Sequence, residues 1–164
     1  MLIGIDASRA VSDHPTGTEL YSRYAIQSLL EASDAHRFRL YFRDEPPAAL
    51  FGAPHVEKRV IPFPRLWTHV RLSGEMLCRP PDVLYVPAHV LPLMRPRHSV
   101  VNIHDLGYRY FPQAHPVLQR WYLALSTRWN ARVATRVFVL SQATKDDLVA
   151  CYGTSPQKIT VVYP

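Results

Sequence analysis

The sequence is poor in cysteine and has no long hydrophobic run. Its 164 residues include only Cys78 and Cys151, which are far apart and belong to no Cys-x-x-Cys pair. A disulfide framework and a zinc cluster are therefore excluded, and the chain fits the reducing cytoplasm. The longest apolar stretch, VLYVPAHVLPLM, is broken by two prolines, and Asp6 and Arg9 interrupt the start. Neither a membrane-spanning helix nor a signal peptide is indicated.

Several motifs that carry well-known chemistry are also absent. No G-x-G-x-x-G follows the first apolar run, and there is no G-x-x-x-x-G-K-[ST], Asp-x-Asp or G-x-S-x-G. These absences argue against dinucleotide-dependent dehydrogenases, phosphate-loop nucleotidases and serine hydrolases. No Cys/His spacing suits a metal ion either, so we expect no metal site and no bound cofactor.

Positive charge is in excess, and it is carried almost entirely by arginine. The 19 basic residues include three lysines, and the formal net charge is +6. Such a charge favours anionic partners, which include nucleic acid, anionic lipid and phosphorylated substrates. The arginines are scattered, without a basic run or an aromatic-glycine RNA motif, so we expect no nucleic-acid partner.

Apolar segments alternate with segments of helical spacing along the whole chain. Strands are predicted at 2–7, 37–43, 55–62, 82–87, 98–105, 136–141 and 158–164, and helices from about 19 to 32 and at 65–78, 115–134 and 141–152. This order predicts a Rossmann-like α/β fold, an open, mainly parallel sheet with helices on both faces. Residues 1–164 form a single domain in this interpretation. The chain stops right after its last strand, which suggests a piece of a longer protein.

The aromatic rows of the helices have a structural interpretation at this stage. In the first helix, Tyr21, Tyr24, Ala25, Leu29 and Ala32 share one face. In the long helix, the shared face is formed by Leu118, Trp121, Tyr122, Leu125 and Trp129. We expect both rows to pack in the core. The helix at 65–78, with Trp67, His69 and Arg71, could instead touch a membrane surface, although packing is favoured there too.

Candidate site residues lie where strands end, because ligands of open parallel sheets bind beyond the carboxyl ends of the strands. The loop HPTGTE precedes the first helix, and its Gly17 lets the backbone approach a ligand. Thr16 or Thr18 can cap the helix and leave amides free for an anion. A turn glycine beside a threonine cap is the structural alternative.

The stretch SVVNIHDLGY places His104 and Asp105 at the end of a buried strand. The two side chains would point to opposite sides if the strand continued through both residues, so we do not expect them to form a hydrogen-bonded pair. His104 can offer a nitrogen or a proton to a sugar hydroxyl or a phosphate, whereas Asp105 can accept from loop amides. A structural role for the histidine is about equally well supported.

Two further residues follow strands. His89 lies between prolines in VPAHVLP, either facing the same edge or capping backbone groups. Ser141 follows RVFVL and is expected to cap the next helix, with ligand contact through that helix N-terminus as the alternative.

The segments IGIDASRA…TGTELYSRYAIQSLL, DVLYVPAHVLPL, VVNIHDLGYRYFP and RVFVLSQATKDDLVACYG…KITVVYP together resemble the amino-terminal half of a family 4 (group 1) glycosyltransferase with two Rossmann-like domains. The resemblance implies a retaining, metal-independent hexosyltransferase. Its amino-terminal domain holds the acceptor, for example a glycan or lipid-linked saccharide. The nucleotide-sugar donor, a co-substrate rather than a cofactor, binds mainly to a carboxy-terminal domain that these 164 residues lack.

The same resemblance implies roles for individual residues. Gly17 matches a glycine that approaches the donor diphosphate or the acceptor, although Thr16 stands where many members have a second glycine. His104 matches the histidine that contacts the transferred sugar and is the candidate catalytic residue. Thr16, Gly17, Thr18, His89, Asp105 and Ser141 are the candidate substrate-binding residues.

Three functions remain open from the sequence. The first is the acceptor-side domain of a cytoplasmic glycosyltransferase, which is inactive as this fragment and could contact a membrane peripherally. The second is a Rossmann-like binding or interaction module without catalysis. A nucleotide-dependent enzyme formed by these residues alone is disfavoured by the missing phosphate-binding motifs.

Overall fold

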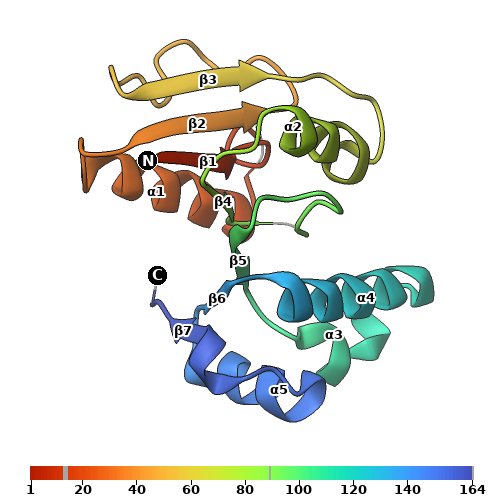
Figure 1. Ribbon diagram of the computed structural model, residues 1–164. Coiled ribbons are helices and arrows are strands. Elements are labelled where there is room, and N and C mark those ends of the chain that lie inside the picture. The colour runs from red at the N-terminus through yellow and green to blue at the C-terminus, as the bar shows by residue number, and fades with distance from the viewer. Residues whose placement is uncertain (13–14, 89, 164) are drawn as a thin grey trace.

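The computed structural model describes residues 1–12, 15–88 and 90–163. Their strands form one seven-stranded sheet in the order β3-β2-β1-β4-β5-β6-β7, with every neighbouring pair parallel (Figure 1). The strands are β1 (Leu2–Asp6), β2 (Arg37–Phe42), β3 (Val56–Val60), β4 (Val83–Val86), β5 (His98–Ile103), β6 (Arg136–Val139) and β7 (Ile159–Val161). The predicted Rossmann-like fold class is therefore confirmed.

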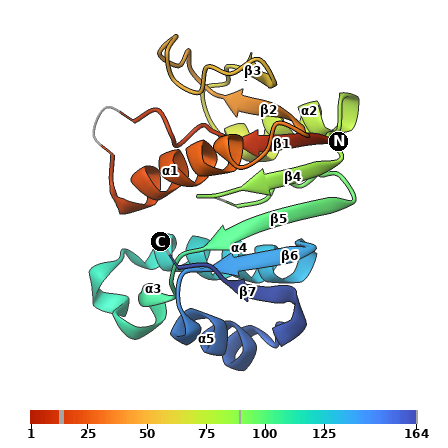
Figure 2. The same cartoon turned by 90° about the vertical axis from the view of Figure 1, so that its left-hand side faces the viewer.

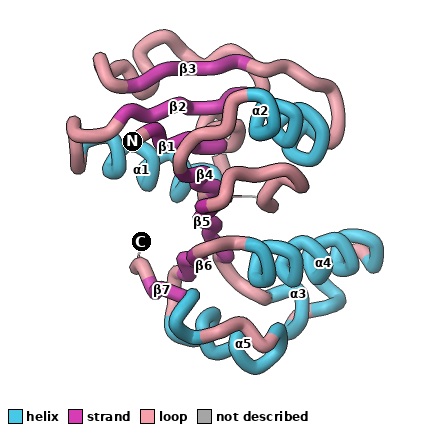
Figure 3. Tube along the Cα trace, viewed as in Figure 1, coloured by secondary structure: helices cyan, strands magenta, loops and turns pink. Residues whose placement is uncertain are grey.

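The helices largely follow the predicted segments (Figure 3). They are α1 (Gly17–Glu31), η1 (Thr68–Leu72), α2 (Ser73–Cys78), α3 (Gly107–Tyr110), η2 (Pro112–Ala114), α4 (Val117–Val133), α5 (Gln142–Tyr152) and η3 (Pro156–Lys158). The segment predicted as one helix at 65–78 begins instead as a π-helical turn, η1, that continues into α2. Strand β5 ends at Ile103, so His104 and Asp105 already lie in the following loop and the expected strand alternation does not apply to them.

The core consists of two layers, one on each face of the sheet. Alternate residues of each strand enter different layers: Tyr85 packs with α1 residues such as Ile26, whereas Leu84 and Val86 pack with α2 and α5. This alternation follows from the two-residue period of a strand. Both faces are apolar, as expected for a parallel sheet buried on its two sides.

The handedness of the strand connections distributes the helices unevenly. The β1–β2 connection runs toward one edge of the sheet, whereas those from β3 to β4, β5 to β6 and β6 to β7 run in the opposite direction. Right-handed crossovers therefore place α1 on one face and α2, α4 and α5 on the other (Figures 1 and 2). Beside α1, a cavity of about 890 Å³ remains over Tyr85, Val100 and Phe138.

Two predicted core rows are not in the core. In α1 the buried residues are Ser22, Ile26 and Leu30, and the predicted row lies beside them, where Tyr24 is 62% exposed. That row borders the cavity just described, because the helices of the described residues leave the neighbouring half of this face uncovered.

The row on α4 is exposed for a different reason. The helix turns Thr127, Asn130 and Ala131 inward, and the Asn130 Oδ1 accepts a hydrogen bond from the Leu91 backbone amide at 2.9 Å. The helix is thus anchored through small and polar side chains together with partly buried apolar residues such as Leu123 and Val133. Its large apolar residues at 118, 121, 122 and 125 point to solvent, and Trp129 is half-buried.

Candidate functional site

A cavity of about 320 Å³ lies at the carboxyl ends of the central strands, the edge at which ligands of open parallel sheets bind. Its lining comes from α1, β5, the loop after β5 and α4, and includes Thr18, Asn102, His104, Asp105 and Gln119. Three of the predicted site residues, Thr18, His104 and Asp105, therefore meet at one cavity. A fourth, His89, lies outside the described residues.

His104 is held in one orientation by two neighbours. Its Nε2 lies 2.8 Å from the Pro87 carbonyl oxygen, and because a carbonyl only accepts, Nε2 must carry the hydrogen. The Tyr21 ring packs edge-on against the imidazole, with centroids 5.1 Å apart and planes at 88°. In the neutral ring Nδ1 then keeps its lone pair and can accept a hydrogen bond.

Burial keeps the His104 ring neutral near pH 7. It lowers the pKa of His104 below the ordinary value of 6.5, and this effect outweighs the hydrogen bond to Pro87 and the charge of Asp105, which both raise the pKa. A neutral imidazole with a fixed tautomer can accept a proton or a hydroxyl hydrogen bond from a bound molecule.

Two hydrogen bonds between side chains connect Tyr21 to the strands beneath α1. The Tyr85 hydroxyl donates to the Asn102 Oδ1 at 2.8 Å, and the Asn102 Nδ2 donates to the Tyr21 hydroxyl at 2.7 Å. Sequence reasoning missed Asn102 and its two tyrosines. The available signal was an asparagine inside the apolar run VVNI, since buried amides need hydrogen-bond partners.

Asp105 lies at the surface and shapes the loop after β5. Its Oδ1 accepts a hydrogen bond from the Gly107 backbone amide at 2.7 Å, the loop-bracing contact that the sequence suggested. A β-carbon on Gly107 would lie 3.1 Å from the same oxygen, which is a tight contact. Asp105 and Gly107 thus fix the turn that leads from His104 into α3.

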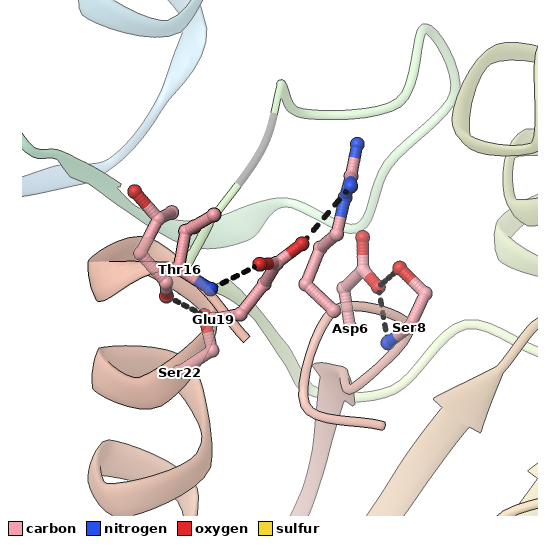
Figure 4. Close-up of polar contacts among 7 residues, drawn as sticks. Asp6, Ser8, Thr16, Glu19 and Ser22 are labelled. Atoms are coloured by element: carbon pink, nitrogen blue, oxygen red, sulfur yellow. Dashed lines mark hydrogen bonds and ion pairs between the residues drawn. The ribbon is translucent and has the colours of Figure 1, made fainter. Parts of the chain in front are cut away.

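The loop before α1 ends in a capped helix start (Figure 4). Thr16 is the N-cap residue, and its backbone amide donates to the Glu19 Oε2 at 2.7 Å. That bond is the main reason why the pKa of Glu19 is lowered, and Arg9 also pairs with Glu19 at 3.3 Å. The Thr18 carbonyl oxygen accepts a hydrogen bond from the Ser22 hydroxyl at 2.8 Å.

Gly17 is the first residue of α1 and borders the large apolar cavity rather than the cavity with His104. A β-carbon added at Gly17 would meet nothing within 4 Å. The packing of the chain therefore does not require glycine at this position, and the space beside it is open to a ligand.

Asp6 is a buried carboxylate at the end of β1 that sequence reasoning did not single out. Its Oδ1 accepts hydrogen bonds from the Ser8 amide at 3.0 Å and the Ser8 hydroxyl at 2.6 Å, as Figure 4 shows. Among the described residues its Oδ2 has no partner. Burial is the main cause of the raised pKa of Asp6.

Ser141 is the N-cap of α5, as predicted. Its Oγ accepts a hydrogen bond from the Thr144 amide at 3.1 Å. The Thr144 hydroxyl in turn lies 3.4 Å from the His104 carbonyl oxygen. Ser141 is thus connected to the His104 loop through Thr144, and the start of α5 approaches the same edge of the sheet.

A search of the described residues for three or more His, Cys, Asp or Glu side chains that could hold a metal ion found no such group. The same part of the chain has no helix long and apolar enough to cross a membrane.

Comparison with protein-family models tests the family resemblance that the sequence suggested. The model of Glycosyltransferase Family 4 matches residues 17–164, which is most of the chain. The chain belongs to Glycosyltransferase Family 4. No curated protein matches this family 4 domain in a sequence search.

A solved structure with a similar fold is the crystal structure of WaaG, a glycosyltransferase involved in lipopolysaccharide biosynthesis. The match has a TM-score of 0.62 at 17% sequence identity, so it supports the fold and not a shared substrate. It covers 100% of the family 4 domain but 45% of the WaaG chain. The domain therefore spans less than half the length of that glycosyltransferase.

Proposed function

We propose that this chain is the acceptor-side domain of a retaining, metal-independent glycosyltransferase. The enzyme transfers a hexosyl group from a nucleotide-sugar to an acceptor such as a glycan or a lipid-linked saccharide. The donor, a co-substrate, is bound mainly by a carboxy-terminal domain outside residues 1–164. The reaction takes place in the cytoplasm, and the 164 residues alone are inactive.

The observation that carries this proposal is the presentation of His104 in a cavity at the carboxyl edge of the sheet. Its Nε2–H is engaged by Pro87, so Nδ1 is the atom that accepts a hydrogen bond from a hydroxyl of the transferred sugar. Such a contact orients the sugar and strengthens as positive charge develops on its ring in the transition state. The leaving diphosphate is neutralised by groups of the other domain.

Most of the remaining candidate residues lie at the same edge of the sheet. Thr18 and Asp105 line the same cavity, and Thr16 and Ser141 cap the two helices whose N-termini approach the edge. Exposed helix amides and the helix dipole favour an anionic group there, such as a phosphate of the donor. Gly17 borders the neighbouring apolar cavity and leaves open space beside the start of α1. His89 is assigned from its place in the sequence alone, in the loop VPAHVLP after a strand.

The test is the change of His104 to Ala in the full-length polypeptide that the gene encodes. We expect sugar transfer to fall by roughly a hundredfold or more, because a positioned polar group typically contributes that much. The melting temperature should change little by comparison. Transfer is followed with a panel of radiolabelled nucleotide-sugars and a whole-cell extract, membranes included, as the source of acceptor.

His98→Ala is the matched control, because His98 is an exposed histidine at the opposite end of the same strand. It should retain normal transfer. Equal activity of the His104 variant and the wild type would refute the role of His104. A full-length protein that transfers no sugar from any donor would favour the non-catalytic binding module instead.

A further inference from the structure

Helix α4 presents a continuous apolar face to solvent. Leu118 is 82% exposed, Trp121 63% and Leu125 63%, and Tyr122 is 50% exposed beside them. These four residues, which we call the α4 stripe, follow the helical spacing of i, i+3, i+4 and i+7. Soluble domains rarely leave so many large apolar side chains together on one helix, so the stripe indicates a binding surface.

The net positive charge of the protein resides in the same part of the chain. Between Asp105 and Asp146 there is no acidic residue, while six basic residues occur at 109, 120, 128, 132, 136 and 145. The other 13 basic residues equal the 13 acidic residues in number. The entire formal charge of +6 is thus contributed by residues 106–145, the segment that contains α4.

Arginines lie along the helix beside the apolar stripe. Arg128 and Arg132 are exposed and follow the stripe toward the carboxyl end of α4. The Arg95 guanidinium lies 5.1 Å from the ring centroid of Trp129, the half-buried residue that continues the stripe. Large apolar groups flanked by arginines are typical of helices that lie in the interface of an anionic membrane.

The stripe also adjoins the proposed site. Tyr122 lines the cavity with His104 and a second cavity of about 390 Å³ that contains Arg9 and Leu66. Leu66 is 68% exposed although its φ of 53° lies in the left-handed region, which disfavours leucine. The Leu66 side chain is therefore exposed to solvent although its backbone conformation is unfavourable. It lies on the same side of the molecule as Tyr122, because both residues line the second cavity.

We propose that the α4 stripe docks the protein on an anionic lipid bilayer. Trp121, Leu118 and Leu125 enter the interface, and Arg128 and Arg132 contact lipid phosphates. A second copy is a poor occupant, because it would bring Arg128 and Arg132 of the two copies together, and like charges repel. If the proposed glycosyltransferase function holds, docking places the His104 cavity beside the membrane, so the acceptor is an amphiphile taken from the bilayer.

The docking test needs no donor and no enzymatic activity, so its outcome is independent of the proposed function. The full-length polypeptide is sedimented with vesicles of phosphatidylglycerol and phosphatidylcholine, and with vesicles of phosphatidylcholine alone. We expect binding to the anionic vesicles, with a blue shift of tryptophan emission, and much weaker binding to the neutral ones. High salt should weaken the binding.

Two double variants separate the apolar and the electrostatic contributions to vesicle binding. Trp121→Ser with Leu125→Ser should lower partitioning at least about tenfold, and Arg128→Glu with Arg132→Glu should do the same, because each basic residue near such a surface contributes about fivefold. The matched controls are Leu77→Ser on α2, where Leu77 is 66% exposed, and Arg37→Glu at the exposed start of β2. All changes are at exposed positions, and circular dichroism verifies the fold.

Equal vesicle binding by the stripe variants and the controls would overturn the proposal. So would the absence of anionic vesicle binding, whether accompanied by self-association that Trp121→Ser abolishes or by tight binding to nucleic acid. Extraction of the acceptor from membranes by detergent would support an amphiphilic acceptor. Transfer to a purely water-soluble acceptor would refute the amphiphilic acceptor but would leave the docking proposal unaffected.

Discussion

Asn102 joins three elements through two side-chain hydrogen bonds. It lies in β5 and is 3% exposed, and it accepts from Tyr85 in β4 and donates to Tyr21 in α1. Tyr21 in turn packs edge-on against His104. The amide therefore stabilises the position of α1 and the orientation of the imidazole at the same time.

Asn102→Leu should lower the free energy of unfolding by about 1–3 kcal/mol, because the buried Tyr85 hydroxyl loses its partner. Adding Tyr85→Phe should restore part of that loss, since removing both partners of a buried bond costs less than removing one. Urea unfolding of the two single variants and the double variant measures the effect. Strictly additive losses would contradict the network.

At the scale of the element, β1 is constrained by its neighbours more than its sequence suggests. It pairs with β2 on one side and β4 on the other. A β-carbon on Gly4 would come within 2.7 Å of the Pro81 Cγ and 2.9 Å of the Tyr41 ring. Glycine is thus required there for the close approach of Tyr41 from β2 and of Pro81, which precedes β4.

Gly4→Ala should therefore destabilise the protein by about 1–3 kcal/mol through overpacking. Gly17→Ala provides the control, because the same methyl group meets open space at the start of α1. We expect no loss of stability for that variant in thermal or urea unfolding. Indistinguishable stabilities of the two variants would show that β1 shifts freely to accommodate the methyl group.

The elements show where sequence reasoning succeeds and where it stops. Strand positions, the parallel sheet and the Ser141 cap were predictable because period, flanking residues and cap chemistry are local properties. The exposed α4 stripe and the cavity beside α1 were not, because they depend on which face of the sheet each crossover occupies. The support of His104 by Tyr21 joins residues 83 positions apart, and no local pattern indicates it.

At the scale of the whole molecule, two partly buried histidines couple stability to pH. Burial lowers the pKa of both His69 and His104 below 6.5. The unfolded chain therefore binds more protons than the folded chain once the pH falls below about 6.5, and the folded state loses stability on acidification. The excess of positive charge acts in the same direction, because it grows as histidines become charged.

We expect the free energy of unfolding to decrease as the pH is lowered from neutral through about 6.5 and below. The double variant His69→Gln, His104→Gln should show a flatter dependence, since glutamine does not titrate and can still donate to Pro87. Denaturant titrations over this pH range test the expectation. An unchanged slope in the double variant would assign the acid sensitivity to other groups.

The outermost strand, β3, has one further consequence. Its sequence VEKRV places Glu57, Lys58 and Arg59 along the open edge of the sheet, where they pair with Arg39, the Ala48 carbonyl and Glu75. An uncovered edge strand offers unpaired backbone groups to any extended peptide. Charges in the middle of the strand make that edge a poor template, so the sheet is protected against growth from one molecule into the next.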